Sequence, residues 1–288
     1  MAVYKRTYHG YAGPVTPAWS RFAIIPRYAY RGLFRSKIMT AFFVLCFLAP
    51  VIFLALIYFV NNIDSFARMF GAADAKSPLA VDGEFFFTYL AFQCPLAFIL
   101  TAFIGPGLIS GDLANGALPL YLVRPFSRAE YVLGKMSVLL ILLSLITWVP
   151  GLILFGAQAA MAGGEWLSQN LWIAWGIFAG AWIWILVISL LALALSAWVK
   201  WRIAAGALLL AVFFVAAGFG EAIDAVLDVH WGRLINLMYV FATVWNKLFR
   251  SHETFEISEV SAWVVLALIS AACLLLLRRK LRAFEVVR

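Results

Sequence analysis

Six apolar runs, each long enough to cross a bilayer, dominate this 288-residue chain. They lie at about 39–60, 85–109, 131–157, 171–199, 203–219 and 261–277. A spanning helix needs roughly 20 predominantly apolar residues. The chain is 65% hydrophobic and only 12% charged, which is far from the composition of a soluble globular domain. We therefore predict an all-α polytopic membrane protein with six transmembrane helices.

The net charge of +8 is distributed unevenly between the loops. If the N-terminus is cytoplasmic, 17 of the 22 Lys and Arg residues fall in cytoplasmic segments, against 3 of the 14 acidic residues. This is the positive-inside asymmetry of membrane proteins, so both termini are expected in the cytoplasm. The excess of Lys and Arg then indicates how the chain is oriented in the membrane, and nucleic acid is not expected as a partner.

The N-terminal segment carries a helical pattern of its own. Between Trp19 and Lys37, one helical face repeats Arg27, Arg31 and Arg35, and the other side carries Phe22, Ala29 and Leu33. Arginines on one side and apolar groups on the other are typical of an interfacial helix. A basic flank that only sets topology is the alternative, and both roles are compatible. No cleavable signal peptide is recognised, so the first span is expected to act as an uncleaved anchor.

Domain boundaries follow from these patterns. We expect a cytoplasmic N-terminus with the interfacial helix at 1–38, a six-helix membrane domain at 39–277 and a basic cytoplasmic tail at 278–288. Within the membrane domain, 110–135 is cytoplasmic and 220–260 lies outside. The outer segment mixes aromatic residues with few charges, which predicts short amphipathic helices at the outer interface, with a re-entrant excursion as the alternative.

Several residues inside the spans break or join helices. Pro50, Pro95 and the pair Pro150 and Gly151 are expected to bend their spans where neighbours satisfy the freed carbonyls. Gly176 and Gly180 form a GxxxG motif that allows close helix approach, within the chain or with a second copy. The polar residues of the spans are interpreted as contacts between helices: Gln93, Thr101, Ser144, Thr147, Ser189 and Ser196.

The cytoplasmic segment 110–135 is the most patterned part of the chain. Ser127 and Glu130 form a capping box just before the third span, so they predict a sharp helix start there. Upstream, Leu118, Leu120 and Leu122 form an apolar patch that charged residues surround. An apolar knob with a polar rim is typical of a docking surface; a loop folded back onto its own helix ends is the alternative.

This segment resembles the one between spans two and three of ABC-2 type permeases. The resemblance is carried by Gly111, Asp112, Gly116, Ala117, Leu118, Arg124, Pro125, Ser127, Arg128, Tyr131, Gly134 and Lys135. They match an acidic residue, a G-T-L-like turn, a leucine-rich stretch, a P-x-S-R element and a Y-x-x-G-K start of span three. Asp112 stands where Glu is usual, and Ala117 where Thr is common. Six spans, an interfacial helix and a basic C-terminal end extend the similarity across most of the chain.

The resemblance implies that the segment is a coupling element. In that family it sits in a cleft of a separate cytoplasmic ATP-binding subunit, whose ATP-driven closure tilts the spans. The implied contact residues are Asp112, Leu118, Leu120, Leu122, Arg124 and Arg128. The implied assembly has two ATPase subunits and a second permease copy or a related permease in a bacterial inner membrane, among membrane lipids, with a path lined by spans one, two and five.

The chain offers no chemistry of its own for energy or catalysis. Gly134 and Lys135 precede Met136 and lack the remaining residues of a phosphate-binding loop, so ATP and magnesium are expected on the partner subunit. The span cores carry no Asp, Glu, Lys, Arg or His, which argues against proton or sodium coupling. No protease or hydrolase motif is present. The three cysteines have no metal-ligand spacing, so no cofactor or metal is expected in this chain.

These observations favour a permease subunit, which is not itself an enzyme. The wide aromatic content hints at export of an amphipathic or lipid-like cargo. The alternatives are a non-transporting membrane scaffold or sensor subunit, or a channel, without ATPase coupling.

Overall fold

The described part of this computed structural model is built from helices alone. The structure describes residues 24–63, 79–117, 128–199, 201–228, 231–252 and 254–280. Its helices are α1 (Ile24–Leu33), α2 (Lys37–Leu45), α3 (Leu48–Asn61), α5 (Gly83–Ile104), α6 (Pro106–Ala114), α8 (Arg128–Ile146), α9 (Trp148–Ala162), α10 (Gly164–Trp198), α11 (Arg202–Leu227), η2 (Trp231–Leu234), α12 (Leu237–Phe249) and α13 (Glu259–Lys280).

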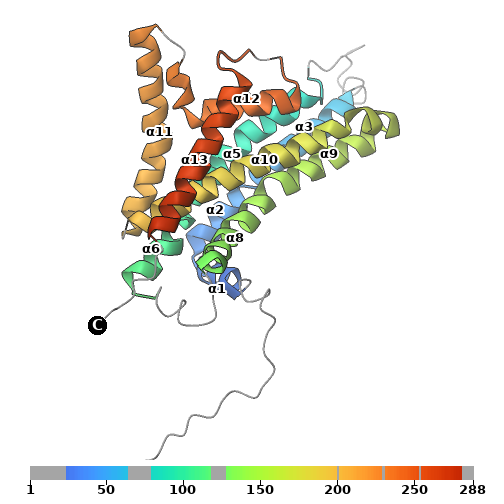
Figure 1. Cartoon of the computed structure of the whole chain (residues 1–288). Coiled ribbons are helices and arrows are strands. Elements are labelled where there is room, and N and C mark those ends of the chain that lie inside the picture. Colours follow the sequence, from blue (N-terminus) through green and yellow to red (C-terminus); the bar gives the residue numbers. More distant parts are fainter. Residues whose placement is uncertain are drawn as a thin grey trace, which may run out of the picture.

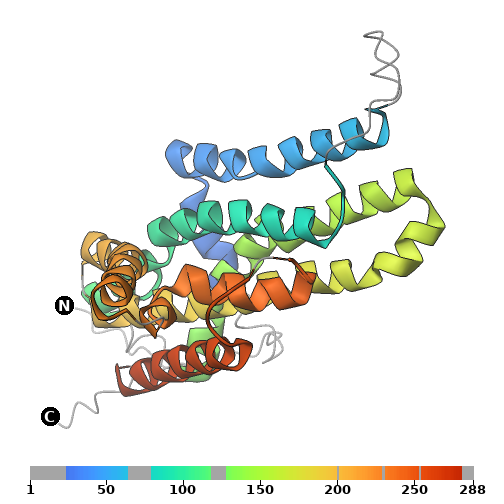
Figure 2. The same ribbon diagram turned by 90° about the horizontal axis from the view of Figure 1, so that it is seen from above.

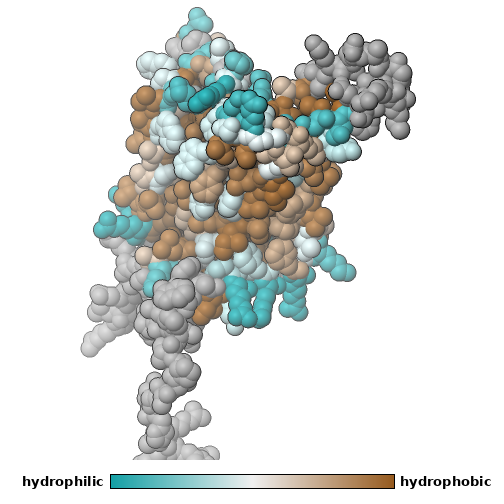
Figure 3. Space-filling view, turned by 90° about the vertical axis from the view of Figure 1, so that its right-hand side faces the viewer, coloured by the Kyte–Doolittle hydropathy of each residue, from teal (hydrophilic) through white to brown (hydrophobic). Residues whose placement is uncertain are grey.

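Six helical stretches are long and apolar enough to span a membrane, as predicted. They run over Lys37–Asn61, Gly83–Ala114, Ala129–Ala162, Gly164–Trp198, Arg202–Leu227 and Glu259–Lys280. The surface shows the same division, because a hydrophobic band crosses the middle of the molecule and hydrophilic groups gather at both ends (Figure 3). The chain is therefore a multi-pass membrane protein.

α10 is the central helix of the bundle. It contacts α5, α6, α8, α9, α11, α12 and α13, and 72% of its apolar window is buried inside the chain. The first, fifth and sixth spans bury only 22%, 28% and 22% of theirs. Seen from above, α3, α5, α12 and α13 lie in successive rows across the bundle (Figure 2). The exposed apolar faces of the outer spans are left for lipid or for another protein.

Charge separates the two ends of the bundle. The end of the bundle at which α1, α6 and the last turn of α13 lie is drawn at the bottom of Figure 1, and we call it the basic end. Basic residues outnumber acidic ones there: Arg27, Arg31, Arg35, Lys37, Lys135, Arg202, Arg278, Arg279 and Lys280, against Asp112 and Glu130. The opposite, acidic end carries Asp82, Glu84, Glu165, Glu221, Asp224, Asp228, Glu256 and Glu259, against Arg233, Lys247 and Arg250.

The predicted N-terminal helix is present as α1, but its apolar side packs against the protein. Ala29 and Leu33 contact the core, while Arg27 and Arg31 are exposed. Arg35 is also exposed, but the prediction that it belongs to this helix is wrong, because α1 ends at Leu33 and Arg35 lies in the turn before α2. The Tyr30 hydroxyl donates to the Val138 carbonyl of α8 at 2.8 Å. Burial raises the pKa of Tyr30 above its ordinary value, so this hydroxyl stays protonated and remains a donor. α1 is thereby docked on α8.

The segment between the fifth and sixth spans forms short helices, as predicted, and folds back onto the bundle. α12 contacts α5, α10 and α13 and buries Phe241, Trp245 and Phe249. Arg233 holds the preceding turn, because it lies 2.6 Å from Glu256 and 3.6 Å from Asp224 and donates to the Tyr239 hydroxyl at 3.1 Å. That last hydrogen bond raises the pKa of Arg233 further, so its charge is permanent.

α12 is the neighbour of the GxxxG motif. A Cβ on Gly176 would lie 3.2 Å from Phe249, and one on Gly180 would lie 3.1 Å from Trp245. Trp245 Nε1 also donates to the Gly180 carbonyl at 3.1 Å. The small residues therefore admit aromatic rings of the same chain, which answers the question the sequence left open.

We predict that Gly180→Val destabilises the protein by about 1–3 kcal/mol, because the new methyl groups would press on Trp245. Gly156→Val is the matched control, since a Cβ there would meet nothing within 4 Å. Thermal unfolding of the purified variants in detergent measures both effects. Equal losses from the two substitutions would contradict the assignment of the cost to the contact between α10 and α12.

Candidate functional site

The two ends of the segment 110–135 are pinned together at the basic end. Asp112, in the last turn of α6, lies 2.8 Å from the Lys135 ammonium of α8 through its Oδ2 atom. The Tyr131 hydroxyl donates to the same Oδ2 at 2.7 Å. The side chains of Lys135 and Asp112 are only 11% and 19% exposed. We call Asp112, Tyr131 and Lys135 the clamp.

Backbone geometry ends α6 just beyond the clamp. Gly116 adopts a φ of +62°, in the left-handed region that glycine tolerates, and the Ala117 N–H donates back to the Asp112 carbonyl at 2.8 Å. α8 then begins at Arg128. The clamp therefore ties the end of α6 to the first turns of α8.

The predicted site residues are distributed around this clamp. Leu118, Leu120, Leu122, Arg124 and Ser127 lie outside the described residues. Asp112 has its partner inside the chain, Lys135. Arg128 and Glu130 lie in the first turn of α8, the turn that the capping box predicts, while the cap itself lies outside the described residues.

A second group of contacts lies in the membrane interior around Gln93 of α5. The Gln93 side chain is fully buried, and its Nε2 atom donates to the Cys46 carbonyl at 2.9 Å and to the Ile146 carbonyl at 2.5 Å. Cys46 lies at the break between α2 and α3, and Ile146 at the break between α8 and α9. One amide therefore joins the first, second and third spans.

Two prolines explain why these carbonyls need a donor. A proline has no N–H, so it leaves the carbonyl four residues earlier without its helical partner. Pro50 frees the carbonyl of Cys46, and Pro150 frees that of Ile146. The two N–H groups of Gln93 replace both missing donors. The predicted bends at Pro50 and Pro150 are thus confirmed, and Gln93 makes the contact between helices that its position suggested.

The break in the second span differs from the prediction. Pro95 lies inside the continuous helix α5, and the break falls at Gly105, between α5 and α6. Pro106 occupies the first turn of α6, where its missing N–H costs little. Ser196 of α10 hydrogen-bonds to the backbone just after this break. Its hydroxyl donates to the Pro106 carbonyl at 2.6 Å and accepts from the Ile109 and Ser110 N–H groups.

Other polar span residues act locally. Thr101 donates to Ala97 within α5, and Thr147, which lies between α8 and α9, donates back to Leu143 of the same span. The predicted role between helices therefore applies to Gln93 and Ser196 but not to these threonines. The Tyr89 hydroxyl was not among the predicted contacts, yet it donates to the Thr147 carbonyl at 2.9 Å beside the third-span break.

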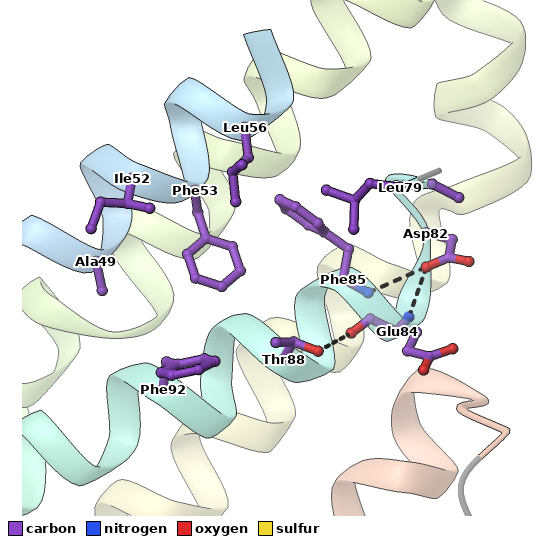
Figure 4. A pocket seen from close by; sticks show the side chains of 11 residues that line it. Ala49, Ile52, Phe53, Leu56, Leu79, Asp82, Glu84, Phe85, Thr88 and Phe92 are labelled. Carbon is purple, nitrogen blue, oxygen red and sulfur yellow. Dashed lines mark hydrogen bonds between the residues drawn. The ribbon is translucent and has the colours of Figure 1, made fainter. Parts of the chain in front are cut away.

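Two apolar grooves flank α5. The first, of about 660 Å³, lies between α3 and α5, where Phe53, Phe85 and Phe92 form walls and Asp82 and Glu84 lie at the rim (Figure 4). Asp82 caps α5 by accepting the Glu84 and Phe85 N–H groups. The second groove, of about 1050 Å³, lies between α5 and α11 towards the basic end. These grooves are built by spans one, two and five.

Comparisons with known proteins give no family. No model of a known protein family matches the chain, and no curated protein matches its sequence. Within the described ranges, no group of three or more His, Cys, Asp or Glu side chains is placed to hold a metal ion.

We predict that Gln93→Leu destabilises the protein by about 1–3 kcal/mol, because two buried carbonyls lose their donors. Restoring backbone N–H groups with Pro50→Ala and Pro150→Ala should shrink that cost, since each new N–H can pair the freed carbonyl. Gln158→Leu is the control: Gln158 is also buried, but it accepts from Asn61 and should not depend on the prolines. Thermal unfolding of the single and combined variants measures these effects. If Gln93→Leu costs as much stability in the Pro50→Ala and Pro150→Ala backgrounds as in the wild type, the prediction is wrong.

For the clamp, we predict that Asp112→Asn and Lys135→Met each destabilise the protein, and that the double variant loses less than their sum. The reason is that either single change leaves a largely buried charge without its partner. The expected coupling energy is about 1 kcal/mol or more. The exposed pair Lys247 and Glu259, which are 2.9 Å apart, is the matched control and should give about 0.5 kcal/mol or less. Coupling as small at the clamp as at this surface pair would refute the prediction.

Proposed function

We propose that this chain is the permease subunit of an ABC-2 type transporter, with the segment 110–135 as its coupling element. The clamp is the observation that carries the proposal. A loop that only connects two spans needs no fixed base, whereas a loop that receives force from another subunit has to pass it to its helices. The ion pair between Asp112 and Lys135 ties α6 to α8 where such a force would arrive.

Charge supports an orientation with the basic end in the cytoplasm. Lys and Arg are enriched in cytoplasmic loops, and the basic end also holds the described ends of the segment 110–135 and the exposed Arg27 and Arg31 of α1. In this orientation both termini are cytoplasmic, the exposed face of α1 meets anionic headgroups of a bacterial inner membrane, and the segment reaches a cytoplasmic ATPase. ATP and magnesium belong to that partner.

The grooves beside α5 support a transport path. They are lined by spans one, two and five, the spans that the family resemblance assigns to a path between two permease copies, and their walls are mostly apolar. Apolar walls suit an amphipathic or lipid-like cargo, and we propose its export. A homodimer or a pair with a related permease, together with two ATPase subunits, completes the assembly.

We predict that the tagged protein, purified in mild detergent from its native host, brings down an ATP-binding subunit with ATPase activity. Leu120→Asp places a charge in the apolar patch, and Arg124→Glu reverses a charge at its rim, so each should abolish the interaction. Arg279→Glu is the control, because it reverses an exposed charge at the same end on α13. Each variant is first shown to unfold at the wild-type temperature.

A folded wild-type protein that brings down no ATPase would overturn the proposal. The alternative function, a non-transporting membrane scaffold, predicts a different outcome in the same preparation. A scaffold that binds an ATPase without transport would show no nucleotide-dependent change in the labelling of cysteines placed along α5, whereas a permease would.

A further inference from the structure

The groove between α5 and α11 combines apolar walls with one cationic side chain. Its walls include Ile99, Phe103, Ile203 and Leu210, and its charged residue is Arg202. At about 1050 Å³ it is as large as the roughly 300–1,000 Å³ sites that hold small molecules. Its lining residues belong to α5 and to the first turns of α11 with the preceding Trp201, and α11 begins near the basic end (Figure 1).

Close backbone approach builds the floor of this groove. A Cβ on Gly206 of α11 would lie 3.0 Å from the Ala102 carbonyl, so only glycine lets the two helices approach this far. A Cβ on Gly107 of α6 would lie 3.1 Å from the Arg202 Nε atom. Gly206 therefore lets α5 and α11 approach closely at the groove, and Gly107 leaves room for the Arg202 side chain against α6.

Arg202 is held in position but keeps unused donors. Its Nη2 atom donates to the Phe103 carbonyl at 3.0 Å, which fixes the guanidinium beside the groove. A guanidinium has five N–H donors, and none of the described carboxylates forms an ion pair with Arg202. The side chain is exposed, and its neighbours Trp201 and Ile203 are 79% and 87% exposed. A cation therefore faces the mouth of an apolar groove among side chains typical of a membrane interface.

We propose that this groove binds a membrane phospholipid with an anionic headgroup. Its acyl chains lie along the apolar walls, and its phosphate pairs with the Arg202 guanidinium, whose planar fork matches phosphate geometry. Basic pockets between spanning helices at the cytoplasmic side are suited to such lipids. The groove between α3 and α5 has the opposite charge at its rim, where Asp82 and Glu84 would repel an anionic headgroup. The inference does not depend on an ATPase partner.

The test uses purified, delipidated full-length protein and two lipids with identical acyl chains, phosphatidylglycerol and phosphatidylcholine. A ligand that binds the folded state raises the unfolding temperature. We expect phosphatidylglycerol to bind about tenfold more tightly. Both lipids offer a phosphate, but phosphatidylcholine also carries a quaternary ammonium group that the Arg202 cation repels. Arg202→Gln should remove this preference for phosphatidylglycerol.

Ala207→Phe should weaken the binding of both lipids, since Ala207 is exposed and lines the groove. Arg278→Gln, which removes an exposed charge on α13, should change neither.

A second measurement locates the lipid even if Arg202→Gln lowers stability. Brominated phosphatidylglycerol should quench tryptophan fluorescence more than brominated phosphatidylcholine, and Trp201→Phe should remove the difference. Equal binding of the two lipids, an equal loss in Arg278→Gln, or stabilisation by inorganic phosphate alone would overturn the proposal. So would a dimer that Ala207→Phe converts to a monomer, because the groove would then hold a second copy of the chain.

Discussion

Backbone carbonyls that prolines leave free inside the membrane are the constraint on which this structure depends. Each unpaired polar group in hydrocarbon costs several kcal/mol, so a broken span must find donors elsewhere in the protein. Gln93 supplies them to the first and third spans. At the break in the second span, Ser196 donates instead to the carbonyl of Pro106 itself. The breaks are therefore also the points at which the spans are joined, and the relative depth of the spans follows from them.

Gln93 is suited to this place by its length and its two donors. Glutamate would bring a charge and no donor, and asparagine is one methylene shorter. While the Gln93 amide donates to both carbonyls, its own oxygen stays unpaired: among the described residues, Gln93 Oε1 has no hydrogen-bond partner. That cost is the smaller one, because one unpaired acceptor replaces two unpaired carbonyls. The three spans gain a common fixed point near the middle of the bundle.

The parts of this arrangement that the sequence could predict are those that a single span determines. The six runs and the bends at Pro50 and Pro150 follow from hydropathy and from the missing N–H of proline. The meeting of both bends at Gln93 does not follow, because it depends on how three spans are rotated against one another. The same holds for Gly180, whose neighbour Trp245 lies on a short helix 65 residues away. α11 continues to Leu227, beyond the apolar run, because a helix need not end where its hydrophobicity does.

The clamp and the Gln93 contacts together divide the bundle into a joined part and a looser part. Asp112 and Lys135 join α6 to α8 at the basic end, and Gln93 joins α3, α5 and α8 deeper in the membrane. A displacement of the segment 110–135 would therefore move the second and third spans as a pair, and Gln93 would carry the first span with them. Among the described residues, α11 has no such tie at depth, because its side-chain hydrogen bonds lie near its two ends, through Arg202 and Asp224. A relative movement between this three-span unit and α11 would open or close the groove that lies between α5 and α11.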